Sequence, residues 1–271
     1  MTTIVAPPPV TVAELVAAVR AQQGEGAVYE VRPVAEVSRS TSAIRLLVVA
    51  AHPGAGATTI SVALADALGG PDSPVQLVDT APIECSGMLG ATEREMSNGL
   101  GPWRRGRRGY VTVDRPTRST SLAELPQLPS TESAAVVIDA GSGWRNLSSE
   151  PNRLWPPDED TNLLVVCRAT VPGVRHAELA LAGLIGEPFV VGVGANRWPR
   201  LVSAAFGTRM TRAMREGRVG LIPADRRLEL NGIDTDPLPR SVGVAAVRLA
   251  ELIWPGLSGT PANQTRKGHR R

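Results

Sequence analysis

Short runs of Val, Leu and Ile alternate with segments of helical periodicity along most of the chain. The runs with the length and composition of buried strands are Ile44–Ala51, Val75–Asp79, Tyr110–Val113, Ala134–Asp139, Leu163–Cys167, Phe189–Val193 and Val219–Ile222. Helical patterns cover Thr58–Leu68, Val174–Leu184, Leu201–Arg215 and Val242–Ile253. Continuous apolar strands separated by helices indicate a parallel sheet covered on both faces. We therefore predict an α/β fold with a doubly wound, mostly parallel sheet flanked by helices, with ligands at the carboxyl ends of the strands.

Composition narrows the class of protein further. The chain has 271 residues, of which 42% are hydrophobic and 20% charged, as in a folded globular protein rather than a disordered one. No run approaches the roughly 20 apolar residues of a membrane span, so we expect no transmembrane segment. The two cysteines, Cys85 and Cys167, are too few for a disulfide framework. We expect a cytoplasmic protein.

The chain divides into three parts by composition. Residues 1–42 are expected to form an N-terminal extension with a short helix and a short strand. Residues 43–257 carry the alternating pattern and form the main domain. Residues 258–271 are polar and basic and are expected to form a disordered tail.

A glycine-rich loop follows the first strand and runs directly into a helix. This phosphate loop (residues 52–59) reads His-Pro-Gly-Ala-Gly-Ala-Thr-Thr. In such a turn, backbone N–H groups and the helix dipole can hold a phosphate, and the glycines let the backbone approach it closely. The hydroxyl of Thr58 stands where it would bind Mg²⁺. The alternative is a tight turn that holds no ligand.

The loop and several later segments together resemble the ParA and MinD family of deviant Walker A P-loop ATPases, which belong to the SIMIBI class. In that family the loop reads Lys-Gly-Gly-x-Gly-Lys-Thr followed by Ser or Thr. Further matches follow in the family's order. Val75–Pro82 resembles the family's second strand and first switch, and Val136–Gly143 resembles its Walker B strand and second switch. Phe189–Asn196 resembles the strand that ends in an adenine-contacting Asn, and Gly220–Asp225 resembles the base-side segment. The resemblance spans about residues 44–254 and implies a P-loop NTPase fold.

The resemblance also implies site residues and a cofactor. The implied cofactor is ATP or ADP with Mg²⁺, and a site without any cofactor is the alternative. The nucleotide positions carried over are Gly54, Ala55, Gly56, Ala57, Thr58, Thr59, Asn196 and Pro223. The Mg²⁺ positions, which apply only if nucleotide binds, are Thr58, Asp79 and Asp139. We interpret the two aspartates as relics or as Mg²⁺-shell groups rather than as acid–base catalysts.

The departures from the family pattern concern charge. His52 stands at the signature lysine, Ala57 at the P-loop lysine, and Ala81 at a carboxylate of the first switch that the family associates with positioning water. The only lysine of the chain is Lys267, in the tail. Phosphoryl transfer depends on electrostatic stabilisation, so losing such a contact costs on the order of 10³-fold in rate. We therefore expect a degenerate Walker A loop and no efficient ATPase activity.

These observations leave three hypotheses for function. The leading one is a catalytically impaired ParA/MinD-like domain that acts as a binding or scaffolding subunit in a bacterial positioning, partitioning, secretion or conjugation system. It would form a homodimer, or a heterodimer with a related ATPase, and could sit at the periphery of a membrane complex. The second is an active switch ATPase in which an arginine or a partner's residue replaces the lysines. The third is a nucleic-acid-binding module.

A basic run between the second and third predicted strands is the main candidate for a partner site. It consists of Trp103, Arg104, Arg105, Gly106, Arg107 and Arg108. We expect it to form an exposed loop beside the first switch, where Trp103 and the arginines would bind an acidic protein or nucleic acid together with the basic tail. Replacing the four arginines with alanine would then leave stability nearly unchanged. A solvated loop without a partner is the alternative.

Overall fold

The computed structural model describes residues 43–149 and 152–255. The expected extension at 1–42 and the basic tail at 258–271 lie outside these residues. Strands that run parallel to one another are β1 (Ile44–Ala50), β2 (Val75–Asp79), β5 (Val111–Pro116), β6 (Ala135–Gly143), β7 (Thr161–Arg168), β8 (Phe189–Val193) and β9 (Val219–Ile222). Two further strands, β3 (Arg94–Leu100) and β4 (Trp103–Arg108), pair antiparallel. The predicted α/β fold with a mostly parallel sheet is confirmed.

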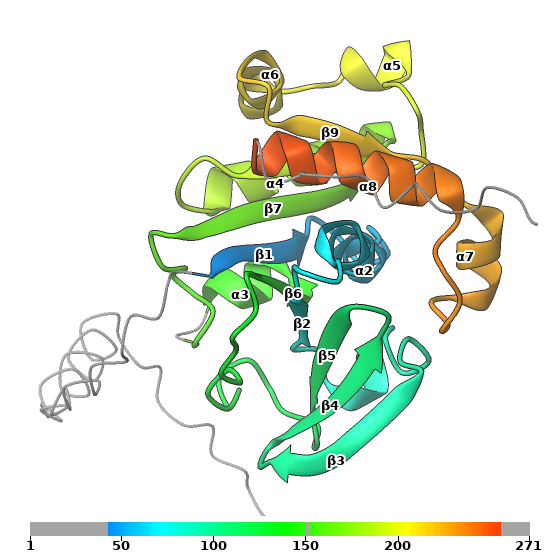
Figure 1. Ribbon diagram of the computed structural model, residues 1–271. Coiled ribbons are helices and arrows are strands. Elements are labelled where there is room, and N and C mark those ends of the chain that lie inside the picture. Colours follow the sequence, from blue (N-terminus) through cyan, green and yellow to red (C-terminus); the bar gives the residue numbers. More distant parts are fainter. Residues whose placement is uncertain (1–42, 150–151, 256–271) are drawn as a thin grey trace, which may run out of the picture. The chain divides into compact units, whose positions relative to one another are not determined.

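The described strands form one sheet with the order β3-β4-β5-β2-β6-β1-β7-β8-β9 (Figure 1). The first strand, β1, lies in the middle, with β6 on one side and β7 on the other. The chain leaves β1 toward β2 on one side and later returns to fill the other side from β7 onward. Such a reversal of strand order opens a crevice at the carboxyl ends of the strands, where ligands of open α/β sheets bind.

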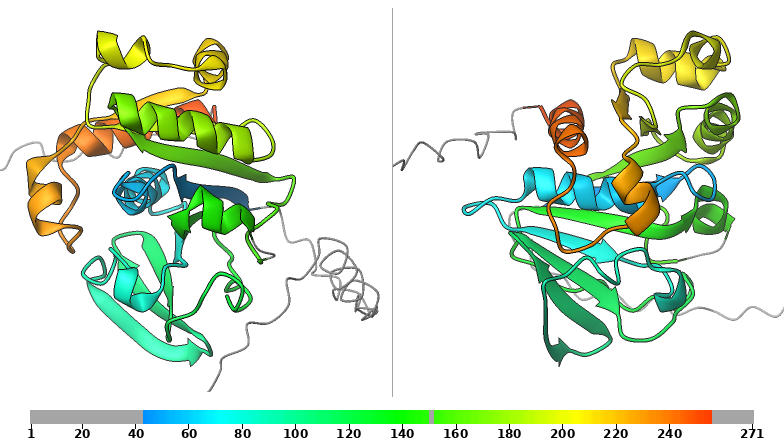
Figure 2. Two further views of the ribbon diagram at one scale, coloured as in Figure 1. Left: turned by 180° about the vertical axis from the view of Figure 1, so that it is seen from behind. Right: turned by 90° about the vertical axis from the view of Figure 1, so that its right-hand side faces the viewer.

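Helices cover both faces of the sheet. One face carries α2 (Ala57–Leu68) and α8 (Arg240–Ile253), and the other carries α3 (Trp144–Ser149), α4 (Val171–Gly183), α5 (Arg200–Ser203) and α6 (Thr208–Arg215) (Figures 1 and 2). The side chains of β1 alternate between the two layers. Leu46 and Val48 belong to the core under α2 and α8, while Leu47 and Val49 belong to the core on the opposite face. This alternation explains why β1 is apolar from Leu46 to Ala50.

The segment Trp103–Arg108 is strand β4 and not an exposed loop, so that expectation was wrong. It pairs with β5 along its whole length, with Arg105 opposite Asp114. A strand made mainly of arginines and glycine has little intrinsic preference for a sheet. It forms here because acidic side chains on neighbouring elements pair with two of its arginines.

The single helix expected over residues 201–215 is two short helices, α5 and α6, separated around Gly207. The carboxylate of Glu178, on α4, accepts hydrogen bonds from the backbone N–H groups of Arg209 and Met210 at 2.8 and 2.9 Å. A Cβ on residue 207 would lie 2.4 Å from the carboxyl carbon of Glu178. Glu178 therefore starts α6 at this point and requires glycine before it.

Three short elements were not expected from the sequence: α3, a 3-10 turn at Ile83–Cys85, and α7 (Arg226–Asn231). The start of α7 has a recognisable signal, because Asp225 accepts hydrogen bonds from the N–H groups of Arg227 and Leu228. Within the described residues, no helix combines the length and the apolar character that crossing a membrane requires.

Candidate functional site

The residues implied by the family resemblance gather at the carboxyl ends of the parallel strands. Across the sheet, β2 ends in Asp79, β6 carries Asp139, and β1 leads into the phosphate loop. On the far side, Asn196 follows β8 and Pro223 follows β9. Carboxylates thus lie on one side of the phosphate loop and the adenine-side candidates on the other, as strand order dictates.

The phosphate loop has an open backbone conformation that only glycine adopts readily. Gly54 and Gly56 have φ angles of 72° and 95°. A Cβ at residue 54 would meet no atom within 4 Å, and one at residue 56 would meet only Val193, at 3.7 Å. The helix α2 begins at Ala57 with no side-chain cap and no acidic residue in its first turn. Its N-terminal N–H groups therefore face no competing anion from the first turn.

His52, which stands at the position of the signature lysine, is held by the fold through both ring nitrogens. Its Nε2 accepts a hydrogen bond from the backbone N–H of Arg168 at 3.2 Å, so Nδ1 carries the proton and donates to the carbonyl of Pro53 at 2.8 Å. The ring also lies 5.4 Å, centroid to centroid, from the ring of His176. His52 thus ties the loop to β7 as a neutral side chain and, in this arrangement, has no N–H left for a phosphate.

Asp79 is buried at the end of β2 and is held by hydrogen-bond donors of the segment that follows. The backbone N–H of Ala81 donates to its Oδ1 at 3.0 Å, and the hydroxyl of Ser86 donates to its Oδ2. Burial raises the pKa of the Asp79 carboxyl, while the two hydrogen bonds and the charge of Arg115 oppose that rise. Ser86 carries no motif in the sequence that would have identified it.

Asp139 lies beside Asp79 on the neighbouring strand, at the same register. Burial and then the charge of Asp79 raise its pKa to about 7, against the opposing effects of the Thr58 hydroxyl and the Gly141 N–H. Its Oδ1 accepts from the N–H of Gly141 at 3.1 Å. Among the described residues, its buried Oδ2 and the buried hydroxyl oxygen of Ser142 have no hydrogen-bond partner. The carboxyl end of β6 therefore presents unsatisfied oxygens, which suits a proton or a cation.

The two segments that resemble the family's switches are packed directly against each other. Gly141 has a φ angle of 62°, and a Cβ on it would lie 2.3 Å from the Cα of Ala81. Ala81 itself is only 4% exposed. Residue 81 is thus packed closely against the second of these segments, and as an alanine it supplies no carboxylate.

The far side of the phosphate loop contains one charged group that the sequence did not single out. Arg168 ends β7, and its guanidinium lies close to Gly194, whose Cβ would be 3.9 Å from Nη2. Gly194 directly follows Val193, whose side chain lies beside Gly56 of the phosphate loop, 3.7 Å from where a Cβ on that glycine would stand. Arg168 is paired with Glu229 of α7 at 3.1 Å, and its side chain is 36% exposed. Attention to every strand end, rather than to matched motifs alone, would have identified it.

Most of the expected partner-binding residues are engaged inside the fold. Trp103 is 2% exposed and donates its indole N–H to the carbonyl of Gln127 at 2.8 Å. Arg105 forms a two-point pair with the buried carboxylate of Asp114, both contacts at 2.8 Å. Only Arg104 and Arg107 of the basic run remain exposed.

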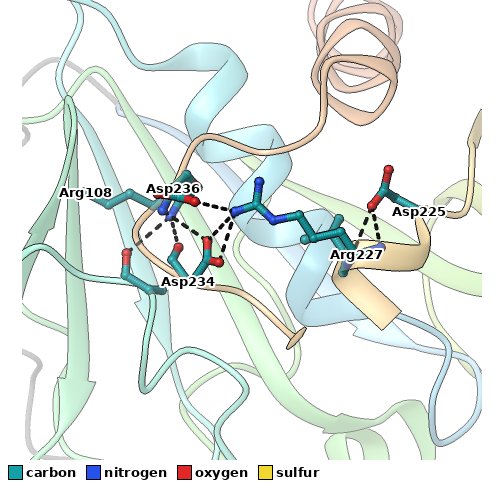
Figure 3. A network of polar contacts seen from close by, with 7 residues as sticks. Arg108, Asp225, Arg227, Asp234 and Asp236 are labelled. Atoms are coloured by element: carbon teal, nitrogen blue, oxygen red, sulfur yellow. Dashed lines mark hydrogen bonds and ion pairs between the residues drawn. The ribbon is translucent and has the colours of Figure 1, made fainter. Parts of the chain in front are cut away.

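Arg108 is the most strongly bound arginine of that run. Its side chain is 4% exposed, and its Nε lies 3.0 Å from both carboxyl oxygens of Asp66 on α2. Its two terminal nitrogens donate to the backbone carbonyls of Asp234 and Asp236, the latter at 2.9 Å. Figure 3 shows Arg227 reaching the side chains of the same two aspartates from α7. Arg108 thus joins β4, α2 and the loop before α8.

No cluster of three or more His, Cys, Asp or Glu side chains able to hold a metal ion occurs within the described residues. The oxygen atoms of Thr58, Asp79 and Asp139 would therefore bind Mg²⁺ only together with phosphate and water oxygens, which is how proteins usually hold this ion.

Similarity to known proteins lies in the fold. No protein-family model matches the chain, and none of the curated proteins matches it by sequence. A ParA family ATPase from Chlorobium tepidum TLS matches with a TM-score of 0.51 at 16% identity, over 77% of this chain and 99% of that one. MinD in the MinC:MinD cell division complex of Aquifex aeolicus gives 0.52 at 15% identity, over 83% and 99%.

A third solved structure extends the comparison to plasmid partition. A plasmid partition protein from Borrelia burgdorferi B31, bound to AMPPNP, matches with a TM-score of 0.51 at 13% identity, over 78% of this chain and 98% of that one. These matches cover almost the whole length of each relative. The chain has the P-loop fold of the ParA and MinD ATPases.

Proposed function

We propose that this protein is a catalytically impaired ParA/MinD-like domain that acts as a binding or scaffolding subunit. The observation that carries the proposal is the state of the two lysine positions. His52 uses both ring nitrogens within the fold, and Ala57 is the first residue of α2 with no cation in its place. Without such cations the charge that develops on phosphate during transfer has little to stabilise it.

The backbone of the phosphate loop nevertheless supports retained binding of ATP or ADP. Gly54 and Gly56 keep the positive φ angles of an open turn, and the start of α2 carries no capping side chain. Backbone N–H groups at such a helix start attract phosphate without any lysine. The partition protein of similar fold from Borrelia burgdorferi was solved with AMPPNP. We expect weak nucleotide binding without efficient turnover.

The residues beside the loop fit a Mg²⁺ ion that accompanies the nucleotide. Thr58, Asp79 and Asp139 would hold it, and the unpartnered Oδ2 of Asp139 is the atom that a cation would satisfy. The ion would supply positive charge to the phosphates. Asp79 would stay in place through Ser86 and Ala81, and Asp139 would give up its proton when the ion enters.

Partners and pathway are inferred from the relatives of similar fold. MinD from Aquifex aeolicus was solved in complex with MinC, its partner in cell division. We infer that this protein pairs with a second copy, or with a related active ATPase, in a bacterial positioning, partitioning, secretion or conjugation system, and that it works in the cytoplasm.

Steady-state hydrolysis measurements test the proposal. Purified protein with ATP and Mg²⁺ should release phosphate no faster than the Thr58→Ala variant, while calorimetry should still detect nucleotide binding to the parent. Steady turnover in the parent that Thr58→Ala abolishes would refute catalytic impairment. A parent that binds no nucleotide would refute retained binding and leave the scaffolding role to rest on protein partners alone.

A second candidate function is an active ATPase in which an arginine replaces the lysines. Arg168 is the observation that favours it, because its guanidinium lies beside Gly194, which in the chain follows Val193, the residue whose side chain lies beside Gly56. If Arg168 serves in this way, Arg168→Ala should abolish turnover and Glu229→Gln should increase it, because Glu229 competes for the guanidinium. Arg145→Ala, which changes an exposed arginine of α3, is the matched control and should leave turnover unchanged.

The third hypothesis, a nucleic-acid-binding module, has less support. Trp103, Arg105 and Arg108, which would have contacted nucleic acid, are engaged with Gln127, Asp114 and Asp66.

A further inference from the structure

The segment between β8 and β9 carries a concentration of positive charge outside the phosphate loop. Residues 195–215 contain five arginines and neither aspartate nor glutamate. The five are Arg197, Arg200, Arg209, Arg212 and Arg215. A run of this kind either finds acidic partners elsewhere in the fold or remains a basic surface.

Acidic side chains from outside the run neutralise only part of this charge. Glu187 and Glu216 each pair with Arg212 at 2.8 Å. The same two carboxylates also pair with Arg218, just beyond the run. The carboxylate of Glu178 accepts from backbone N–H groups at the start of α6. The other arginines of the run are exposed and have no side-chain ion pair or hydrogen bond among the described residues: Arg197, Arg200, Arg209 and Arg215.

The two helices of the run turn their basic side chains away from the core. Val202 of α5 and Met210 and Ala213 of α6 are buried in the same core layer as α4. At 3.6 residues per turn, Arg212 and Arg215 lie on the opposite side of α6 from the buried pair. Figures 1 and 2 show α5 and α6 together at one end of the described chain, outside β9 and α4. The charge is therefore presented outward.

An apolar side chain projects beside these arginines. Leu201 follows Arg200 on α5 and is 81% exposed, more than any other large apolar side chain among the described residues. It adds nothing to the core, since Val202 is the residue that holds α5 in place. An apolar group among unpaired basic side chains is the combination with which peripheral proteins contact a bilayer. The α5–α6 surface is defined here as Leu201 with the four unpaired arginines.

We propose that the α5–α6 surface binds an anionic lipid bilayer, with Leu201 inserted at the acyl boundary and the four arginines at the lipid phosphates. The inference goes beyond the proposed function, which concerns nucleotide and protein partners. It holds whether or not the phosphate loop binds a nucleotide, because no residue of that loop takes part.

The charge and the apolar side chain together are enough for a reversible attachment. A basic side chain close to an anionic leaflet contributes roughly fivefold in affinity. Inserting a leucine contributes about tenfold or more. A nucleic acid would match the charge, but its phosphate backbone offers Leu201 no apolar partner. The combination therefore favours lipid.

Vesicle binding by the full chain tests the proposal. The probe is a vesicle of phosphatidylcholine mixed with phosphatidylglycerol, and the uncharged control is a vesicle of phosphatidylcholine alone. Sedimentation should show binding to the anionic vesicles at least about tenfold tighter than to the control, and added salt should weaken it. No binding to the anionic vesicles, or equal binding to both kinds, would overturn the proposal.

Two exposed leucines form a matched pair of variants. Leu201→Ser should weaken binding to the anionic vesicles about tenfold, because the inserted apolar group is lost. Leu230→Ser changes a side chain of α7 that is 72% exposed and lies outside this surface, so it should change binding less than about twofold. Neither leucine supports the core, and thermal melts should show unchanged folds. Equal binding by the parent and both variants would overturn the insertion of Leu201.

Two double variants separate local charge from net charge. Arg200→Gln with Arg215→Gln should weaken vesicle binding about thirtyfold, at roughly fivefold per residue. Arg118→Gln with Arg248→Gln removes the same charge from exposed arginines elsewhere and should weaken it less than about threefold. The basic residues of 258–271 are present in every variant. Equal losses in the two double variants would mean general attraction or binding by those residues, and would overturn the proposal.

A short DNA duplex distinguishes the two kinds of anionic partner. Duplex binding that depends on Arg200 and Arg215, in a protein that does not bind anionic vesicles, would assign the surface to nucleic acid and overturn the proposal. Vesicle binding that Leu201→Ser weakens supports it. ATP turnover and nucleotide affinity are measured separately, so failure of this surface and failure of the proposed function give different results.

Discussion

The phosphate loop and the antiparallel end of the sheet differ in how they hold positive charge. At the loop, His52 and Ala57 occupy the positions of the family's two lysines. His52 accepts a hydrogen bond at Nε2 and is therefore neutral, and Ala57 has no charged group. At the antiparallel end, Arg105 and Arg108 occupy a strand and are paired with Asp114 and Asp66. The loop retains its backbone conformation but lacks the cationic side chains, whereas several cationic side chains of β4 stabilise the fold. The number of charges in a segment therefore says little about their use until their partners are known.

Among the variants that test this contrast, Arg108→Ala is expected to have the largest destabilising effect. Removing the guanidinium leaves Asp66 and three backbone carbonyls without their donor, which for a mostly buried pair costs about 3 kcal/mol or more. For a domain of this size, the melting temperature should fall by roughly 10 °C. Urea unfolding measures the change. If Arg108→Ala is as stable as the parent, β4 is not held by its arginines and the contrast is lost.

At the phosphate loop, the matching expectation is a dependence of stability on pH. Burial and the charge of Asp79 raise the pKa of folded Asp139 to about 7, whereas the pKa of an unfolded Asp is about 4. The folded state thus binds more protons between these values, so the free energy of unfolding should decrease as pH rises from about 4 to 7 and level off above. Asp139→Asn should be more stable than the parent at pH 8, by up to about 4 kcal/mol, because each unit of pKa shift corresponds to about 1.4 kcal/mol.

Urea unfolding at pH 5 and pH 8 checks this expectation. The exposed Asp160→Asn is the control and should keep the pH dependence of the parent. An Asp139→Asn variant that keeps the full dependence would show that the buried carboxyl is not its source.

A smaller effect concerns the missing cation itself. Ala57→Lys should tighten ATP binding about tenfold, because the turn at Gly54 and Gly56 already presents its backbone and residue 57 is partly exposed. Hydrolysis should stay slow, since Ala81 provides no carboxylate. Calorimetry with ATP and Mg²⁺ gives the affinity, and Ala57→Gln is the uncharged control. An unchanged affinity would mean that the backbone no longer holds phosphate, so that more than the cations has been lost.

The smallest effect is expected where arginines of β4 face solvent. Arg104→Ala combined with Arg107→Ala should change the free energy of unfolding by less than about 0.5 kcal/mol, because exposed pairs contribute little. Thermal melts of this double variant beside Arg108→Ala provide the measurement. A large loss of stability in the double variant would mean that the exposure of an arginine does not indicate whether it stabilises the fold.

The parallel part of the fold was predictable because local sequence and tertiary position agree there. Val75–Asp79 and Phe189–Val193 are mainly apolar and mainly buried, and both are strands with the predicted bounds. Asp79 and Asp139 lie at one edge of the sheet because the carboxyl ends of neighbouring parallel strands meet there. The strand β4 was not predictable in this way, because its stability comes from Asp66 and Asp114, and nothing in the local sequence marks those aspartates as its partners.

The candidate site was likewise only partly predictable from the sequence. Its glycines and Thr58 are visible as a motif, but the hydrogen bond that ties His52 to β7 comes from Arg168, 116 residues away. Ser86 and Arg115 became relevant only once they lay near Asp79. The break at Gly207 likewise depends on Glu178, a residue of another helix. Side-chain partners from distant elements decide these features, and a single sequence does not name them.

The contacts of Arg108 also have a consequence for how fast the protein folds and unfolds. They join residues 42, 126 and 128 positions apart along the chain. The two longest can form only after the loop before α8 has been made and brought to β4, which is a late step for so distant a closure. Contacts absent from the transition state slow unfolding rather than speed folding. In stopped-flow measurements, Arg108→Ala should therefore raise the unfolding rate and leave the folding rate nearly unchanged, so that Arg108 sets the lifetime of the folded state.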